Sequence, residues 1–532
     1  MAKALGKQSM RLRMVDPCVQ KRGGTWSRSF RDHSAAMVNI VVPISAADAQ
    51  GVITLARHAH AAGANLVEIR LDSCVANGAD PKTVIAAIPQ LALPAILTIR
   101  HRSENGDHAI SDEDRVNYYH EAMRKGVAWI DCELAQWPIL QKLGLNRSGK
   151  TKLILSYHDF DGMGNDVPGR IAAMRAAGAD IAKIAVRAGD ASDLEVIRLL
   201  YTDTTGPLVA IAMGEHGLPT RLLAGVWGAA LTFARLDGDV GSAPGQPTVG
   251  ELLRTYRVTK QNAQTRIYGV IGSPVSHSLS PIIHNTAFAH HQLNAVYVPF
   301  RVEDPVAFWR ACGSWIDGLS ITIPHKQSLI GQMHTIEDLA RRIGAMNTVY
   351  RDRDLRPVGA NTDAYAVIHC LEEQLGELRN RHVLVLGAGG VARAIGVALC
   401  DRGARVTIVN RTADKAQELA QEVGATFMTM EQALTTSYDV LINGTAAGMG
   451  KPDETPWPTE CHREGSVVFD TVYHPLETKL LRDAQRAGAR TVSGLEMLVR
   501  QALGQYQRWT GREAPQHLMY RACLDRIGAT HS

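Results

Sequence analysis

The stretch Asp180-Ile-Ala-Lys-Ile-Ala-Val186 is a short apolar run with one amine inside it. Its length and its isoleucine, alanine and valine content predict a buried strand of a barrel-type sheet. Burial beside apolar neighbours disfavours the charged form of a lysine. Lys183 is therefore either paired with an acid or available to form an imine with a ketone.

Seven further runs of this kind lie between residues 38 and 237, separated by Ala-rich stretches of helical composition. The eight runs cover residues 38–43, 66–71, 95–100, 129–134, 153–157, 181–186, 208–213 and 230–235. Eight strand–helix units in about 200 residues predict an α/β fold of the (β/α)8 barrel type.

Polar residues stand in or directly after these runs: Glu68, Arg70, Arg100, His158, Asp159, Lys183 and Arg221. Active sites of such barrels lie at the C-terminal ends of the strands, so we expect these side chains to meet on one rim. Any one of them could be an ordinary solvated residue, but their shared position favours a site.

The residue types on this rim indicate the substrate and the chemistry. Three arginines and a lysine favour an anionic, oxygen-rich substrate, because a guanidinium holds carboxylates bidentately. His158 titrates near working pH and is the expected proton carrier. Glu104 could fix the tautomer of His158 or hold its charged form.

Residues 38–257 resemble type I 3-dehydroquinate dehydratase. The matching stretches are Glu68-Ile-Arg70, Arg100 with Glu104, Ser156-Tyr-His-Asp159, Lys183-Ile-Ala-Val186 and Ser242-Ala-Pro-Gly-Gln246. The resemblance implies that Lys183 forms an imine and that His158 is the general base and acid, with Glu104 as its partner. It also implies substrate binding by Glu68, Arg70, Arg100, Arg221, Ser242 and Gln246. An iminium acidifies the adjacent C–H, so this chemistry requires no metal.

A second pattern begins after a Gly/Pro/Ser-rich stretch, residues 238–247, and a predicted helical linker to about Gln264. Between His382 and Arg411 the order is strand, glycine turn, helix, strand, which is typical of a Rossmann unit. Its turn, Gly387-Ala-Gly-Gly-Val-Ala392, matches GxGxxA and would place a pyrophosphate at the start of the helix. A tight turn without a ligand is the competing interpretation.

The end of the second Rossmann strand indicates the cofactor. Asn410-Arg-Thr412 lacks the acid that would bond the ribose hydroxyl of NAD. Arg411, with Lys415 one helical turn later, would attract a 2′-phosphate, so NADP(H) is the predicted cofactor. Arg411 as a plain surface charge is the alternative.

Residues 265–530 resemble shikimate dehydrogenase, through residues 272–281, 321–326, 344–348, 361–363, 470–473 and 494–501. The resemblance makes Lys326 and Asp363 the catalytic pair, and an ammonium held by a carboxylate is a suitable proton donor for an alkoxide. It implies a substrate pocket lined by Ser278, Ser280, Thr322, Asn347, Tyr473 and Gln501. It implies a nucleotide site made of Gly387, Ala388, Gly389, Gly390, Val391, Ala392, Asn410, Arg411, Thr412, Lys415 and Gly494.

Two positions depart from the dehydrogenase pattern. Ser320 stands where stand-alone bacterial members often have Asn, and Ala364 follows Asp363 where Gly or a larger residue is common. Neither position touches the catalytic pair, but both bear on substrate affinity.

These motifs predict four parts of the chain. They are a basic extension (1–36), the dehydratase-like barrel (37–257), a substrate-binding domain (265–370, completed by C-terminal helices in 495–530) and a Rossmann NADP-binding domain (371–494).

The 532 residues are 45% apolar and 21% charged, as in ordinary globular enzymes. No apolar run approaches the roughly 20 residues that span a bilayer, so no membrane segment is expected.

The charge and cysteine patterns restrict location and partners. Residues 1–36 carry eight Lys/Arg against two Asp, so the net charge of +4 leaves −2 for the rest, which argues against a nucleic-acid partner. The eight cysteines show no metal-binding spacing and fit a reducing compartment. We expect a cytoplasmic protein with a disordered tail or with a start site set upstream of Met37. A plastid protein with an Arg-rich transit segment is the alternative.

The two resemblances together predict a bifunctional enzyme. It would dehydrate 3-dehydroquinate to 3-dehydroshikimate and reduce that product to shikimate with NADPH, and channelling between the sites is a hypothesis. The sequence leaves open whether the protein forms a homodimer. A metabolite sensor that keeps both folds is disfavoured because Lys183, His158, Lys326 and Asp363 are present. A quinate-directed or NAD-using second half is disfavoured by the Ser278/Ser280 pair and by Arg411.

Overall fold

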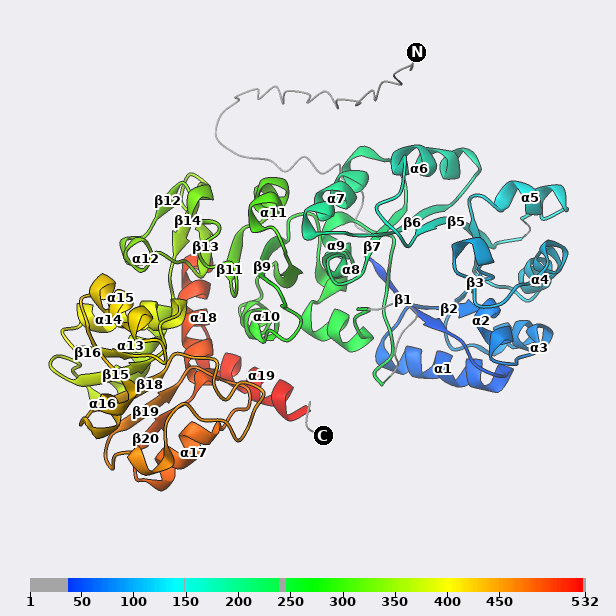
Figure 1. Ribbon diagram of the computed structural model, residues 1–532. Coiled ribbons are helices and arrows are strands. Elements are labelled where there is room, and N and C mark those ends of the chain that lie inside the picture. The colour runs from blue at the N-terminus through cyan, green and yellow to red at the C-terminus, as the bar shows by residue number, and fades with distance from the viewer. Residues whose placement is uncertain (1–36, 148, 239–244, 530–532) are drawn as a thin grey trace, which may run out of the picture. The chain divides into compact units, whose positions relative to one another are not determined.

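The computed structural model describes residues 37–147, 149–238 and 245–529 (Figure 1). The expectations for residues 1–36 and for Ser242 lie outside this part of the chain. Within it, no helix is both long and apolar enough to cross a membrane.

Eight parallel strands form the first sheet, in the order β7-β6-β5-β4-β3-β2-β1-β8. They are β1 (Asn39–Ile44), β2 (Leu66–Arg70), β3 (Ala95–Thr98), β4 (Trp129–Glu133), β5 (Lys152–Asp159), β6 (Ile181–Arg187), β7 (Leu208–Met213) and β8 (Leu231–Phe233). The Ala230 backbone N–H, just before β8, donates to the Leu208 carbonyl of β7 at 2.9 Å and joins the two ends of the sheet. The predicted (β/α)8 barrel is confirmed.

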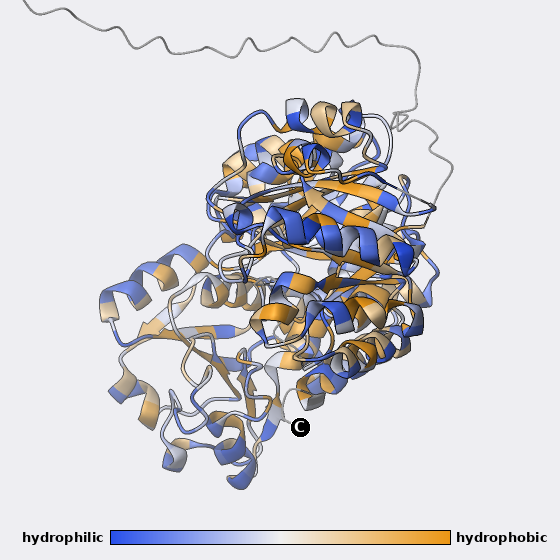
Figure 2. Cartoon of the chain, turned by 90° about the vertical axis from the view of Figure 1, so that its right-hand side faces the viewer, coloured by the Kyte–Doolittle hydropathy of each residue, from blue (hydrophilic) through white to orange (hydrophobic). Residues whose placement is uncertain are grey.

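Helices alternate with these strands: α1 (Ala49–Ala62), α2 (Leu71–Ala76), α3 (Pro81–Ala86), α4 (Asp112–Arg124), α5 (Trp137–Lys142), α6 (Val167–Ala176), α7 (Leu194–Asp203), α8 (Leu218–Leu222) and α9 (Ala224–Trp227). Local chemistry explains where they begin. The Ser111 side chain caps α4 by accepting from the Asp114 backbone N–H, and acidic residues of the first turn suit the helix dipole. In Figure 2 the strands are mostly hydrophobic, and many helix surfaces are hydrophilic.

The barrel interior follows from the two-residue period of its strands. An apolar layer fills one level, made by residues that include Leu66, Ile96, Ile154 and Ile181. The side chains two residues later on the same strands point to the same interior. On these four strands those residues are Glu68, Thr98, Ser156 and Lys183, so a polar layer lies directly next to an apolar one.

The second sheet has six strands in the order β10-β9-β11-β13-β14-β12. Its elements are β9 (Arg266–Gly272), α10 (Ser280–His290), β10 (Ala295–Arg301), α11 (Pro305–Cys312), β11 (Gly318–Ile321), β12 (Thr335–Ile336), α12 (Asp338–Ile343), β13 (Thr348–Arg351), β14 (Pro357–Ala360) and α13 (Asp363–Leu375). The predicted helical linker before it is wrong in part. It contains a π-helix, Glu251–Thr255, and a 3-10 turn, Val258–Lys260, because Arg257 takes a positive φ of 50° between them.

The third sheet is parallel, in the order β17-β16-β15-β18-β19-β20. Its elements are β15 (His382–Leu386), α14 (Gly390–Asp401), β16 (Arg405–Val409), α15 (Ala413–Val423), β17 (Thr426–Met428), α16 (Met430–Thr435), β18 (Val440–Asn443), β19 (Val467–Asp470), α17 (Lys479–Arg486) and β20 (Arg490–Val492). Apolar clusters cover both faces, one with α13, α14 and α15 and one with α16 and α17 (Figure 1). This is the doubly wound Rossmann order, with its switch point between β15 and β18.

Two helices end the described chain, α18 (Gly494–Thr510) and α19 (Gln516–Ala529). α18 packs against α13, and α19 packs against α10. The last segment thereby carries Gln501 and Gln505 back to the sheet that holds β9 and β11.

Candidate active sites

A cavity of about 670 Å³ opens at the C-terminal ends of the barrel strands. The predicted residues Glu68, Arg70, Arg100, Glu104, His158, Lys183, Arg221 and Gln246 all line it. The structure therefore brings these side chains together on one rim, whereas Asp159, also expected there, does not line the cavity and accepts from the Tyr157 hydroxyl instead.

Lys183 lies in the middle of β6 and is 5% exposed. Its Nζ donates to Asp131 Oδ2 at 2.8 Å and to Glu68 Oε1 at 3.4 Å, and it lies 4.5 Å from the centre of the Phe233 ring. Of the two alternatives that the run 180–186 left open, the structure therefore shows a lysine that is paired with acids. The side chains on the outer face of β6 are apolar. On the face that points into the barrel, the lysine meets two carboxylates, one from β4 and one from β2.

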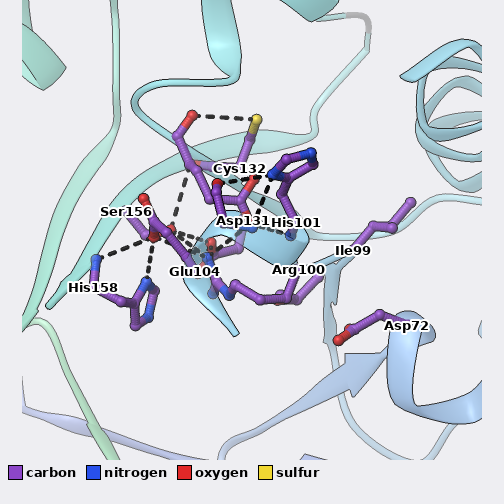
Figure 3. Close-up of polar contacts among 12 residues, drawn as sticks. Asp72, Ile99, Arg100, His101, Glu104, Asp131, Cys132, Ser156 and His158 are labelled. Atoms are coloured by element: carbon purple, nitrogen blue, oxygen red, sulfur yellow. Dashed lines mark hydrogen bonds and ion pairs between the residues drawn. The ribbon is translucent and has the colours of Figure 1, made fainter. Parts of the chain in front are cut away.

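Arg100 lies next to this lysine in a buried charge network that the sequence reasoning missed (Figure 3). Its Nη2 donates to Asp131 Oδ1 at 3.2 Å, and its Nη1 donates to Glu133 Oε1 at 3.1 Å and to Ser156 Oγ at 2.8 Å. Arg115 from α4 donates to the second Glu133 oxygen at 2.5 Å. Burial by itself would raise the pKa of the Asp131 carboxyl, but Lys183 and Arg100 hold that pKa well below its usual range.

His158 at the end of β5 faces Glu104, as predicted. Its Nδ1 lies 2.8 Å from Glu104 Oε2, and its backbone N–H donates to the same oxygen at 3.1 Å (Figure 3). Burial, with Arg100 and Lys183 nearby, holds the pKa of His158 well below its usual value. The low pKa favours the neutral imidazole, and in the tautomer that donates Nδ1–H to Glu104 the Nε2 lone pair is available as a base.

The remaining arginines of the rim differ in their partners. Arg70 is held by Asp72, which accepts from its Nε at 3.0 Å and from its Nη2 at 2.7 Å. Arg221 in α8 is 7% exposed, and no side chain among the described residues pairs with its guanidinium. Burial lowers the pKa of Arg221 to about 10, still far above neutrality. A buried, unpaired guanidinium on a cavity wall favours an anionic ligand.

In the second half, Lys326 and Asp363 lie together. Lys326 Nζ donates to Asp363 Oδ2 at 2.7 Å, and Asn347 Nδ2 donates to Asp363 Oδ1 at 2.8 Å. Asp363 is the first residue of α13, where the positive end of the helix dipole favours a carboxylate. Asn347 also donates to Gln501 Oε1 at 3.4 Å, so α18 contributes to the same cluster.

The other predicted substrate residues lie on neighbouring loops. Ser278 Oγ accepts from the Ser280 backbone N–H at 3.2 Å at the start of α10. The Thr322 N–H donates to the Ile271 carbonyl at 3.0 Å, which places it beside the end of β9. Tyr473 follows β19 and packs against an apolar cluster together with Leu279, and burial raises the pKa of its phenol. No contact in the described residues links Tyr473 to the catalytic pair.

The glycine turn after β15 has the shape expected of a phosphate site. Gly387 has a φ of 109°, and a Cβ there would lie 2.9 Å from Thr445 Cγ2. At Gly389 and Gly390 a Cβ would meet no atom within 4 Å, so the space before the first turn of α14 is open. Ala388, Val391 and Ala392 complete this turn. Open space at the N-terminus of a 12-residue helix fits a pyrophosphate.

The ribose side of this site carries exposed positive charge. Arg411 and Lys415 are both exposed, and neither side chain has an ion pair within the described ranges. Asn410 Nδ2 donates to the Thr412 carbonyl at 3.1 Å and orders the turn that presents Arg411. Gly494 begins α18, where a Cβ would lie 2.4 Å from the Val472 carbonyl oxygen. The described residues contain no cluster of His, Cys, Asp and Glu side chains that could hold a metal ion.

Comparison with known proteins identifies the family. Family models match for type I 3-dehydroquinase (40–263), shikimate dehydrogenase substrate binding domain (270–349), shikimate/quinate 5-dehydrogenase (369–449) and shikimate 5′-dehydrogenase C-terminal domain (494–524). The chain is 36% identical over 506 residues to the bifunctional 3-dehydroquinate dehydratase/shikimate dehydrogenase, chloroplastic, of Arabidopsis thaliana, covering 91% of this chain and 83% of that protein. The chain belongs to this bifunctional family.

Other relatives match one half or both. The NADP(+) shikimate dehydrogenase of Methanosarcina acetivorans is 41% identical over 50% of this chain and 99% of that protein. The solved dehydroquinate dehydratase and shikimate dehydrogenase from S. pombe is 25% identical, with a TM-score of 0.43 over 92% of this chain and 98% of that one. The bifunctional enzyme described here is thus a type I dehydroquinase and an NADP-linked shikimate dehydrogenase of the shikimate pathway, as predicted.

Proposed function

We propose that Lys183 and His158 carry out the dehydration and that Lys326 and Asp363 support the reduction. The observation that carries the first assignment is the convergence on one cavity of a buried amine, an imidazole held by Glu104 and the buried Arg221, whose guanidinium has no side-chain partner among the described residues. Arg221, with Arg70, Arg100, Glu68 and Gln246, would bind the carboxylate and hydroxyl groups of 3-dehydroquinate.

The dehydration is written as follows. Lys183 Nζ adds to the ketone carbon, and loss of water from the carbinolamine gives an iminium. His158 Nε2 removes a proton from the adjacent carbon, and the electron pair moves to the iminium nitrogen. The resulting enamine expels the hydroxyl group as water, with its proton supplied by the His158 imidazolium. Hydrolysis of the product iminium releases 3-dehydroshikimate and Lys183.

The reduction needs a proton donor at the ketone oxygen. Bound NADPH would supply a hydride to the ketone carbon of 3-dehydroshikimate. Lys326 donates a proton to the oxygen, and Asp363 holds the ammonium in place. Ser278, Ser280, Thr322, Asn347, Tyr473 and Gln501 would position the substrate, and Arg411 with Lys415 would hold the 2′-phosphate of the nucleotide.

The decisive experiment uses borohydride. Purified full-length protein is incubated with 3-dehydroquinate and borohydride, and any adduct is mapped by peptide mass spectrometry. A reduced adduct on Lys183 supports the imine. If folded protein gained no adduct on this lysine, the metabolite-sensor interpretation would be favoured instead.

Location and assembly stay predictions. A cytoplasmic protein is expected, or a plastid protein if residues 1–36 are a transit segment, and mapping the mature N-terminus distinguishes the two. A homodimer is checked by light scattering of the purified protein.

A further inference from the structure

Asp131 on β4 is the carboxylate closest to the reactive amine. Its Oδ2 accepts from Lys183 Nζ at 2.8 Å, whereas the nearest Glu68 oxygen lies at 3.4 Å. Asp131 is fully buried, and Lys183 is 5% exposed. Solvent therefore screens this ion pair little, and the charge of each partner depends strongly on the other.

The two oxygens of Asp131 have separate tasks. Oδ1 accepts from Ser156 Oγ at 2.6 Å and from Arg100 Nη2 at 3.2 Å (Figure 3). Oδ2 has Lys183 as its partner. Contacts from β5 and from the segment after β3 thus fix the carboxylate and leave one oxygen facing the amine.

The ionisable groups around Asp131 come from every neighbouring element. They are Lys183 (β6), Glu68 (β2), Arg100 and Glu104 (after β3), His158 (β5), Tyr119 (α4, which donates to the Asp131 backbone carbonyl) and, on β4 itself, Cys132 and Glu133. Lys183 and Arg100 are the cations that contact the carboxylate.

We propose that Asp131 is a catalytic residue that acts as the counter-ion of the iminium formed on Lys183. Imine formation on this ammonium is charge-neutral overall: the ammonium and the ketone become an iminium N–H and one water. One cation replaces another at the same nitrogen, and Asp131 keeps its hydrogen-bonded partner. The inference rests on the imine of the proposed function.

The counter-ion has a chemical consequence. An imine is an effective electron sink only while its nitrogen is protonated, and a buried carboxylate 2.8 Å away stabilises that proton. When His158 removes the C–H proton, positive charge moves from the nitrogen to the imidazole. Asp131 then favours return of the charge to the nitrogen, which accompanies expulsion of the hydroxyl group.

The test compares Asp131→Asn with Glu133→Gln. Glu133 is equally buried and bonds Arg100, Arg115 and the His101 N–H, but it does not contact Lys183, so its variant reports loss of a buried carboxylate from the same network without loss of a Lys183 contact. Borohydride trapping with 3-dehydroquinate and steady-state dehydration are measured between pH 6 and 9, together with thermal unfolding of each variant.

Dehydration by Asp131→Asn is expected to fall about 100-fold or more. Trapping is expected to survive at the acidic end and to disappear as pH rises, because the imine without its counter-ion loses its proton. Glu133→Gln should keep trapping across the range. If Asp131→Asn were trapped at high pH as well as the wild-type protein is, the inference would be overturned. Equal losses of trapping in both variants at every pH would also overturn it. If the wild-type protein gave no adduct, the imine of the proposed function would itself be wrong.

Discussion

Lys183 and Lys326 are the candidate reactive amines of the two halves, and their surroundings differ. The Lys183 side chain is 6% exposed and contacts two carboxylates, in a layer that also holds Arg100 and Glu133. The Lys326 side chain is 20% exposed and contacts one carboxylate, whose second oxygen accepts from the neutral amide of Asn347.

This difference follows from the two reactions. A substrate held covalently as an iminium carries a charge inside the protein, so the dehydratase site needs buried groups that hold this charge in every step. A dehydrogenase that delivers one proton needs a single ion pair that solvent can reach to restore the proton. Exposure of the lysine thus separates a nucleophile from a proton donor.

Reciprocal removal of the two amines gives the largest expected effects. Lys183→Ala should lower dehydration at least about 10⁴-fold, because no other lysine among the described residues lines the cavity. Lys326→Ala should lower shikimate oxidation about 10²- to 10⁴-fold through loss of the proton carrier. Each variant should keep the other activity, measured by enone absorbance and by NADPH absorbance. If either substitution silenced both activities in folded protein, the assignment of two separate sites would be wrong.

The pH dependence of the dehydratase sharpens the contrast. Burial raises the pKa of Glu104 to about 7. Below that pH the protonated carboxyl can donate to His158 Nδ1, which moves the imidazole proton to Nε2 and removes the base. Dehydration should therefore fall as pH decreases through about 7. The ion pair Lys326–Asp363 of the other half contains no histidine, so this change of tautomer has no counterpart there.

The variant Glu104→Gln tests whether Glu104 causes the fall of the dehydration rate at low pH. This variant should lose about 100-fold in dehydration and should no longer respond near pH 7, leaving a limb at lower pH from His158. The neighbouring Asp159, which bonds the Tyr157 hydroxyl at 2.9 Å and does not contact the imidazole, provides the control Asp159→Asn. A limb near pH 7 that survives in Glu104→Gln contradicts the assignment.

Sequence patterns placed the predicted catalytic residues because strand ends of a barrel meet on one rim. His158 occupies such a position and Lys183 lies inside β6 on the face that points to the barrel interior, and both strands could be found by apolar content alone. Asp131 was not found, although it stands two residues after Trp129 and thus on the interior face of its strand. Its partner is set by the positions of β4 and β6 on the two sides of β5, which no local pattern contains.

The second half shows the same limit. The nucleotide turn is local, so its glycines were predictable from one segment of the chain. Ser320 was noted only as a departure from the family pattern, whereas the structure bonds it to Gln505, which lies 185 residues away in the sequence. Long-range polar contacts of this kind follow from tertiary packing.

Cofactor choice is expected to depend on Arg411. Arg411→Gln should raise the KM for NADPH about 10- to 100-fold, because a charge-assisted hydrogen bond to the 2′-phosphate is lost, and should leave the KM for NADH unchanged. Arg402→Gln is the matched control: it removes an exposed arginine at the C-terminal end of α14 that is already paired with Glu372. Equal changes with both cofactors would show that Arg411 does not recognise the phosphate.

The smallest expected effect concerns a buried chain of neutral groups behind the dehydrogenase site. The Tyr297 hydroxyl donates to Ser320 Oγ at 2.6 Å, and Ser320 donates to Gln505 Oε1 at 2.9 Å. Gln505 Nε2 donates to the Asn347 carbonyl at 3.2 Å, while the Tyr297 phenol also bonds Ser280. The chain thus joins a predicted substrate serine to the amide that holds Asp363.

Tyr297→Phe removes one hydroxyl from this chain and keeps the ring. Loss of a neutral hydrogen bond costs about 0.5–1.5 kcal/mol, so the KM for shikimate should rise about 3- to 10-fold while dehydration is unchanged. Tyr268→Phe is the control, because Tyr268 is equally buried in the neighbouring strand and its hydroxyl bonds the Trp509 carbonyl instead. The same KM in both variants would show that the chain supports folding alone. A rise confined to Tyr297→Phe would show that neutral hydroxyls orient the dehydrogenase substrate.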